Sequence, residues 1–330
     1  MLLAGDVGGT KTDLAVFSDE AGTLTAVVEG QRESRSFPDL ESLVVDFLQE
    51  HDLSITRASF GVAGPVVEGR SRITNLPWVL SEVKLEKALG LQAAHLINDV
   101  AAHAYAVPRL SDDDFHTLVE GQAIEHGTVA VIAPGTGLGE AFVTCDDGRY
   151  HAHATEGGHT DFSPTTPRQI ELLEHLMQRH GHVSWERVCS GIAIPDIYEF
   201  LRAAGYAAET PEVAQEIASA DDATPPISQA AFERRPPCPL CRATMELFVE
   251  LLGAEAGNLA LKTLANGGVY LSGGIPRRIL PALQEDRFIE TFYSKGRMSE
   301  LLRRFPVRVV LNKRIALLGA AWYGLDQMSG

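Results

Sequence analysis

The sequence predicts an α/β protein whose two halves each begin with a β-hairpin. Residues 2–17 have the pattern of strand, glycine turn and strand, and residues 128–145 repeat that order around a second glycine turn. Helix and strand patterns alternate after the first hairpin, which is typical of an α/β domain. From residue 167 onward the chain is mainly helical. The repeated hairpin suggests a duplicated architecture in which each half offers one phosphate loop.

The elements of the first half combine apolar strands with amphipathic helices. Their expected positions are strands at 23–29, 58–64 and 95–97 and helices at 39–50, 81–89 and from about 100 to Pro108. An acidic stretch at 111–114 is interpreted as a helix cap or a solvated turn.

The second half adds strands at 128–133, 140–145, 269–275 and 307–311 and helices at 171–179, 194–203, 245–264 and 316–325. Residues 219–237 are rich in Pro, Ala and acidic residues, which indicates a loose surface segment around one short helix. We expect a small domain of residues 1–108 plus 313–330 and a larger, helix-rich domain of residues 109–312.

The composition is that of a globular enzyme of about two domains. The chain has 330 residues, of which 45% are hydrophobic and 22% are charged. No run approaches the roughly 18 apolar residues of a membrane helix, and the first residues lack the features of a secretory signal. A net charge of −16 disfavours nonspecific binding to nucleic acid or membranes, because both are anionic. We therefore expect a cytoplasmic protein that binds neither.

Four cysteines are too few for a disulfide scaffold. Cys238 and Cys241 form a CxxC motif, but a metal or redox role would need a second ligand pair or a thioredoxin-like frame. We interpret them as two thiols at the start of a helix.

Three glycine turns could contact a nucleotide. In the first, GDVGGT at 5–10, adjacent glycines let backbone amides approach a phosphate, and Asp6 is placed to hold Mg²⁺ through water. The second, GTGLG at 135–139, is followed by a strand instead of a helix, which disfavours a dinucleotide fold. The third, SGGI at 272–275, would let adenosine lie against the backbone. A plain hairpin or strand-to-helix turn remains the alternative for each.

Two further motifs carry polar side chains suited to sugar chemistry. Asp99 follows a short buried strand, and a positioned Asp is the usual acceptor of the proton that a sugar hydroxyl loses when it attacks phosphorus. Capping of the following helix is the alternative role. Glu156 and His159, in the motif EGGH, offer acceptors and donors for vicinal hydroxyls. Half of a metal site is the alternative, although zinc would need further Cys or His ligands.

Together the motifs resemble those of bacterial glucokinases. GDVGGT at 5–10, IND at 97–99, GTGLG at 135–139, EGGH at 156–159, GHVSWERV at 181–188 and SGGI at 272–275 occur in the order seen in that family, over nearly the whole chain. The resemblance implies a two-domain actin-like ATPase (ribonuclease H-like) fold with an interdomain cleft. It also implies ATP-dependent phosphorylation of glucose at the 6-hydroxyl, with ATP and Mg²⁺ as cofactors, and a homodimer.

The resemblance also implies a role for each motif residue. Asp99 is expected to be the general base, and the expected glucose ligands are Asn98, Asp99, Glu156, His159, Glu186 and Asn75. The expected nucleotide contacts are Asp6, Gly8, Gly9, Thr10, Gly135, Thr136, Gly137, Gly273 and Gly274. No cysteine-rich zinc motif follows His159, so we expect no structural zinc. Lys11 either touches phosphate or faces water.

Other functions of the same fold stay open at this point. A kinase for another hexose or an N-acetylhexosamine would use the same loops and base. A non-catalytic sugar sensor is the alternative from a different class, and Asp99 argues for catalysis over sensing.

Overall fold

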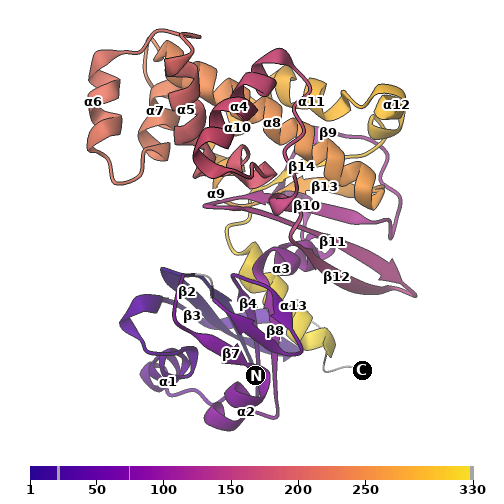
Figure 1. Cartoon of the computed structure of the whole chain (residues 1–330). Helices are drawn as coiled ribbons and strands as arrows, with labels where there is room; N and C mark the ends of the chain where they lie inside the picture. Colours follow the sequence, from indigo (N-terminus) through magenta and orange to yellow (C-terminus); the bar gives the residue numbers. More distant parts are fainter. Residues whose placement is uncertain (21–22, 74, 328–330) are drawn as a thin grey trace. The chain divides into compact units, whose positions relative to one another are not determined.

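The computed structural model describes residues 1–20, 23–73 and 75–327. The chain splits into two compact units (Figure 1). Unit 1 consists of Met1–Asp114, Ala141–Ala154 and Asn312–Gly330, and unit 2 of Phe115–Glu140 and Thr155–Leu311. The predicted α/β class is confirmed.

Unit 1 is built on a five-stranded sheet in the order β3-β2-β1-β4-β8. The strands are β1 (Leu2–Val7), β2 (Lys11–Glu20), β3 (Thr23–Glu33), β4 (Arg57–Val62) and β8 (Ala93–Asn98). β1 pairs antiparallel with β2 and parallel with β4, and β4 pairs parallel with β8. The register places Val7 beside Val62 and Val62 beside Asn98. The first glycine turn and the Asn98–Asp99 motif therefore leave the sheet at the same edge.

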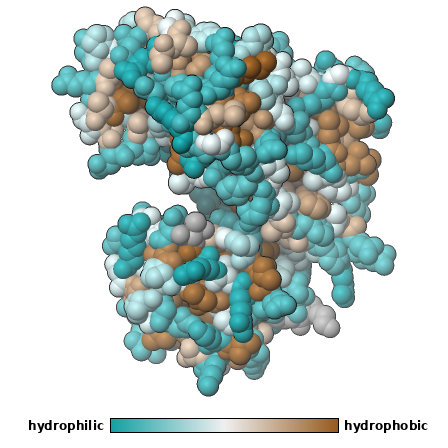
Figure 2. Space-filling model, in the orientation of Figure 1, coloured by the Kyte–Doolittle hydropathy of each residue, from teal (hydrophilic) through white to brown (hydrophobic). Residues whose placement is uncertain are grey.

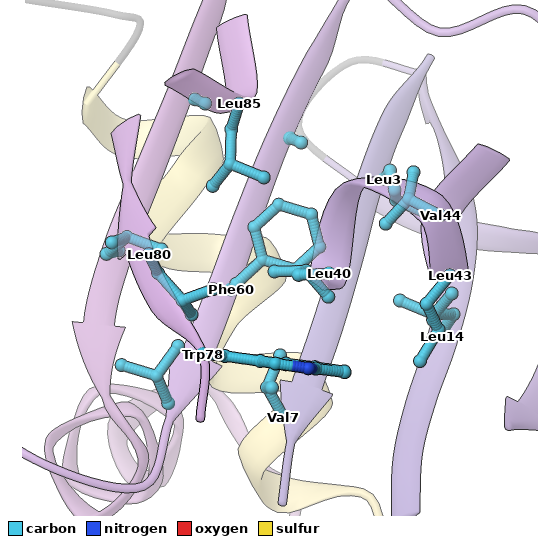
Figure 3. Packing of buried hydrophobic residues seen from close by; sticks show 14 of the residues in the cluster. Leu3, Val7, Leu14, Leu40, Leu43, Val44, Phe60, Trp78, Leu80 and Leu85 are labelled. Carbon is cyan, nitrogen blue, oxygen red and sulfur yellow. The ribbon is translucent and has the colours of Figure 1, made fainter. Parts of the chain in front are cut away.

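A hydrophobic core fills one face of this sheet. It is covered by α1 (Leu40–Glu50), α2 (Glu82–Leu89) and a small antiparallel sheet of β5 (Val66–Val67), β6 (Arg70–Arg72) and β7 (Val79–Ser81). Figure 3 shows Phe60 of β4 among Leu40, Leu80 and Trp78, all of which are buried. The short strands β5–β7 were not predicted, because two or three residues carry no readable period.

Two small-residue helices, α3 (Asp99–Ala106) and α13 (Ile315–Gln327), pack closely together in unit 1. Gly319 makes this possible, because a Cβ at that position would lie closer than 3.0 Å to the backbone oxygen of Ala102. α13 also packs on β1 and β4. The alanine-rich sequence of α3 therefore reflects a helix crossing, where bulky side chains would keep the backbones apart.

The second sheet has six strands in the order β12-β11-β10-β13-β14-β9. These are β9 (Phe115–Val119), β10 (Val129–Pro134), β11 (Leu138–Asp146), β12 (Arg149–Thr155), β13 (Gly268–Leu271) and β14 (Val307–Val310). In chain order, β10 to β14 follow the same 3-2-1-4-5 arrangement as the strands of unit 1. The predicted duplication is confirmed, with β9 added as an unpredicted edge strand.

The longest helix of unit 2 is α8 (Pro239–Thr263), most of whose residues are buried. The others are α4 (Pro167–His180), α5 (Ala193–Ala203), α6 (Pro211–Ser219), α7 (Thr224–Phe232), α9 (Gly274–Arg278), α10 (Leu280–Leu283), α11 (Asp286–Tyr293) and α12 (Ser299–Leu302). The helices α5, α7 and α11 pack on α8. Cys238 and Cys241 lie at the start of α8, as predicted.

The prediction of a loose segment at 219–237 was wrong in one respect. It does contain one short helix, α7, but that helix packs on α8 and buries Ile227, Ala230 and Ala231. Its apolar face is too short to stand out from the surrounding Pro and Ala.

Polar residues cover most of the face seen in Figure 2, with hydrophobic residues scattered among them, as is usual for protein surfaces. Within the described ranges, no helix is both long and apolar enough to cross a membrane.

Candidate active site

Asn98 and Asp99 stand where β8 ends and α3 begins. Asn98 is the N-cap of α3: its side-chain oxygen accepts hydrogen bonds from the backbone amides of Val100 and Ala101 at 3.1 and 3.0 Å. Its side-chain amide donates to Asp99 Oδ1 at 3.0 Å and to the carbonyl of Gly64 at 3.2 Å. The cap is therefore Asn98, and Asp99 occupies the first turn, where Oδ1 also accepts from the Val100 amide at 2.9 Å. Asn98 and the helix terminus together fix the orientation of the Asp99 carboxyl.

Asp6, near the end of β1, belongs to the same edge. Loss of solvation raises the pKa of its carboxyl to about 7, and the negative charges of Asp99 and Asp13 add to the rise. Asp6 and Asp13 line a pocket of about 370 Å³ together with Lys313 and Arg314. A buried carboxyl group close to other carboxylates is costly to ionise. A divalent cation bound beside it would stabilise the ionised form.

The donor set fits Mg²⁺ bound mainly by other oxygens. Among the described residues, no group of three or more His, Cys, Asp or Glu side chains is arranged to hold a metal ion. Mg²⁺ commonly keeps several waters and takes one or two carboxylates plus substrate phosphates. Asp6 could supply such a carboxylate.

The first glycine turn is closely packed from both sides. A Cβ on Gly9 would lie 2.8 Å from Asn75 Cβ, so this glycine lets the turn and the Asn75 loop approach each other. The Gly8 carbonyl accepts a hydrogen bond from Ser34 Oγ at 2.8 Å, and Ser34 is itself hydrogen-bonded to Thr12 at 3.0 Å. Ser34 was missed, because nothing in its local sequence connects it to a turn that lies elsewhere in the chain.

Thr10, at the end of this turn, and Lys11, the first residue of β2, are both exposed. Thr74, which precedes Asn75, lies outside the described residues.

Glu156, His159 and Glu186 come together in unit 2. His159 ends the 3-10 helix η4 (Gly157–His159), and Glu186 lies in η5 (Trp185–Arg187). His159 Nε2 lies 3.8 Å from Glu156 Oε2, and His159 Nδ1 lies 3.9 Å from Glu186 Oε1. Glu186 Oε2 accepts a hydrogen bond from the Leu138 amide at 3.1 Å. Two carboxylates and an imidazole thus form a cluster of acceptors and donors.

The second glycine turn contacts this cluster through Gly137 and lines a pocket with Gly135 and Thr136. Gly137 faces the Glu186 carboxylate: a Cβ there would lie closer than 3.0 Å to Oε2. Gly135 and Thr136 line a pocket of about 650 Å³. The Gly135 carbonyl accepts from the Gly191 amide at 2.7 Å, and the Thr136 carbonyl accepts from the Ile192 amide at 3.3 Å. These bonds tie the turn to the residues that precede α5.

The 650 Å³ pocket combines apolar and polar walls. Gly274 at the start of α9 lines it, and Gly273, with φ of 93°, is the N-cap of that helix. Ile192, which is 40% exposed, offers an apolar surface, and Ile275 lines the pocket as well. Ile192, residues 220–224 and Arg278 were not predicted, because they reach the pocket from separate helices and loops.

Comparison with known proteins shows the family of this chain. The family model described as Glucokinase matches residues 3–327. The glucokinases of Nostoc punctiforme and Synechocystis sp. are 41% and 40% identical to this chain; the alignments cover 97% of this chain and 98% and 96% of the relatives.

Solved structures of similar proteins show the fold. The crystal structure of glucokinase from an Antarctic psychrotroph is 32% identical, with a TM-score of 0.85 and 98% of both chains covered. A ROK family glucokinase from Streptomyces griseus, crystallised with glucose and AMPPNP, is 20% identical with a TM-score of 0.65, over 98% of this chain and 99% of that one; at this identity the likeness shows the fold alone. The predicted actin-like ATPase fold is confirmed. Because the family model and the relatives both span nearly the whole chain, the protein belongs to the glucokinase family.

Proposed function

We propose that this protein transfers the γ-phosphoryl group of ATP to the 6-hydroxyl of glucose, giving glucose 6-phosphate and ADP. Family membership supports the reaction class. The observation that carries the proposal is the Asp99 carboxyl, held at the end of β8 by bonds from Asn98 and the Val100 amide. A general base must be oriented before the substrate arrives, and this one is.

Asp99 has the role of general base in this proposal. The attacking hydroxyl loses its proton as the bond to phosphorus forms, and the carboxylate accepts that proton. The bond from Asn98 restrains the carboxyl so that little orientational freedom is lost on reaction. Asn98 and Asn75 are the further sugar contacts that we assign to unit 1.

Glu156, His159 and Glu186 are the sugar ligands that we assign to unit 2. Carboxylates accept hydrogen bonds from hydroxyls, and an imidazole can donate or accept. The Leu138 amide already holds one oxygen of Glu186, which leaves Oε1 on the side of His159. Such a fixed set of acceptors would distinguish hydroxyl stereochemistry.

The nucleotide is assigned to the glycine turns. Gly8, Gly9 and Thr10 would contact phosphate through backbone amides and a hydroxyl. Gly135, Thr136 and Gly137 are assigned as the second phosphate loop. Adenosine is assigned to the 650 Å³ pocket, which Gly274 lines, with Gly273 next to it in the chain. Mg²⁺, when bound, neutralises charge on the phosphates, and Asp6 would hold it through water.

A substrate panel tests this function. Purified protein with Mg²⁺ and ATP is assayed with glucose, mannose, fructose, N-acetylglucosamine and N-acetylmannosamine, and we expect the highest kcat/KM for glucose. Higher efficiency with an N-acetyl sugar would overturn the assignment of glucose. Phosphorylation of none of these sugars would overturn the kinase assignment itself.

A further inference from the structure

A buried pair of carboxyl groups lies beneath the turn that carries Glu156 and His159. Glu140, on β11, is 2% exposed, and Glu255, in the middle of α8, is 0% exposed. The two side chains are hydrogen-bonded to each other. Buried carboxyl groups are uncommon, and two in contact cannot both be ionised without a large electrostatic cost. One proton is therefore shared between them at neutral pH.

The surroundings place that proton on Glu140. Glu255 accepts hydrogen bonds from Asn258 Nδ2 at 2.7 Å and from Lys262 Nζ at 3.2 Å, so its negative charge is compensated. Glu140 Oε1 is buried and has no hydrogen-bond partner among the residues that the structure describes. Burial, followed by the charge of Glu255, raises the pKa of Glu140 to about 8.

The other titratable groups around the pair do not reverse this assignment: the charge of Lys262 lowers the pKa of Glu140, but burial and the charge of Glu255 outweigh it. Lys295 interacts with Glu255 but donates its Nζ to the Ala254 carbonyl at 2.8 Å, and burial lowers its pKa. The Cys189 thiol is buried, and desolvation together with the two glutamates raises its pKa, so it stays neutral. Lys262 compensates Glu255 from the solvent side.

Glu140 contacts the sugar-binding turn in two ways. Its side chain lies directly against Gly157, where a Cβ would come closer than 3.0 Å to Oε2. Its backbone carbonyl accepts a hydrogen bond from Thr155 Oγ1 at 2.9 Å, and Thr155 Oγ1 accepts in turn from the Gly157 amide at 3.1 Å. A displacement of the Glu140 side chain toward Gly157 would therefore move that residue, which lies between Glu156 and His159.

We propose that Glu140 is a positioning residue for glucose binding: its neutral carboxyl, hydrogen-bonded to Glu255, packs against the turn from Glu156 to His159 and holds that turn in position. The inference rests on the proposed function, because it assumes that this turn binds the sugar. Loss of the proton would place a second negative charge beside Glu255, and the repulsion would push the side chain toward Gly157. Glucose binding should then weaken in alkaline solution while the protein stays folded.

Direct titration with glucose, without nucleotide, tests the inference. For the wild type we expect the Kd to rise about tenfold per pH unit above the pKa of Glu140, which lies near 8. Glu140→Gln keeps the shape and an N–H donor for Glu255, so its Kd near neutral pH should stay within about threefold of the wild type, with no alkaline rise. Glu140→Met keeps the volume without the hydrogen bond, and its Kd should rise at least about tenfold at every pH.

Glu246→Gln is the matched control, because it removes a carboxylate from α8 that pairs with Arg242 and Arg287 at the surface. It should show the wild-type pH profile. An unchanged alkaline rise in Glu140→Gln, or a Kd as weak as that of Glu140→Met at neutral pH, would overturn the inference. Thermal unfolding of each variant at each pH separates lost binding from lost folding. If the wild type phosphorylated glucose but the expected pH profiles and Kd values were not found, only the role of Glu140 would be wrong. If the wild type did not bind glucose at all, the proposed function would be wrong.

Discussion

Replacing Gly137 by alanine should displace the Glu186 carboxylate. The backbone at Gly137 does not have positive φ, so alanine is tolerated there conformationally. The obstacle is the side chain opposite, because the new Cβ would lie closer than 3.0 Å to Glu186 Oε2 and 3.3 Å from its Cδ. Ordinary contact begins at 3.4 Å, so the oxygen must withdraw by at least 0.4 Å.

That shift is enough to break a hydrogen bond. Glu186 Oε2 accepts from the Leu138 amide at 3.1 Å, already near the long end of the normal range, and a further 0.4 Å takes it to about 3.5 Å. A hydrogen bond to a charged group contributes about 1.5–3 kcal/mol. We expect the free energy of unfolding to fall by about that amount. A comparable loss at the sugar would weaken glucose binding by about 10- to 100-fold.

Isothermal titration with glucose in the absence of nucleotide, together with urea unfolding, measures both effects. Gly135→Ala is the matched control in the same turn: φ there is not positive, and no described atom lies within 4 Å of the added Cβ. It should leave the glucose Kd unchanged. Glucose affinity within about twofold of the wild type in Gly137→Ala would refute the role that we assign to Glu186.

Three further predictions concern other parts of the molecule. Asp99→Asn should reduce kcat by about 10²–10⁴ while glucose still binds, because the amide cannot accept the hydroxyl proton; near-normal turnover would mean that another residue is the base. Gly319→Ala should destabilise the protein by about 1–3 kcal/mol or more in urea unfolding, because Ala102 presents a backbone oxygen that cannot move aside. Gly61→Ala, whose Cβ would meet its nearest neighbour at 3.6 Å, should cost less, and equal losses would contradict the packing argument. Metal analysis of untagged protein should find no stoichiometric zinc. One zinc per chain would contradict the interpretation of Cys238 and Cys241 as two thiols without a metal.

Features set by near neighbours in the chain could be predicted from the sequence. The two hairpins follow from apolar strands that flank glycine turns, and β8 leads into α3 because a short apolar run is followed by Asn98, a good N-cap. The fold class also follows from the order of such elements. Asn98 was nevertheless assigned only to the sugar, although most of its hydrogen bonds serve the cap and the orientation of Asp99. A side chain can have both roles, and the pattern does not separate them.

Only the tertiary structure revealed contacts between residues that are distant in the chain. Ser34 supports the Gly8 turn, the Leu138 amide holds Glu186, and Glu140 meets Glu255 beneath Gly157. Ser34, Glu140 and Glu255 do not stand out in their own segments, because burial and pairing, which give each its role, arise when separate strands and helices pack. The protonation of Glu140 is the clearest case. A glutamate in a strand reads as an exposed, ionised residue, and it is burial and the charge of the neighbouring Glu255 that favour its neutral form.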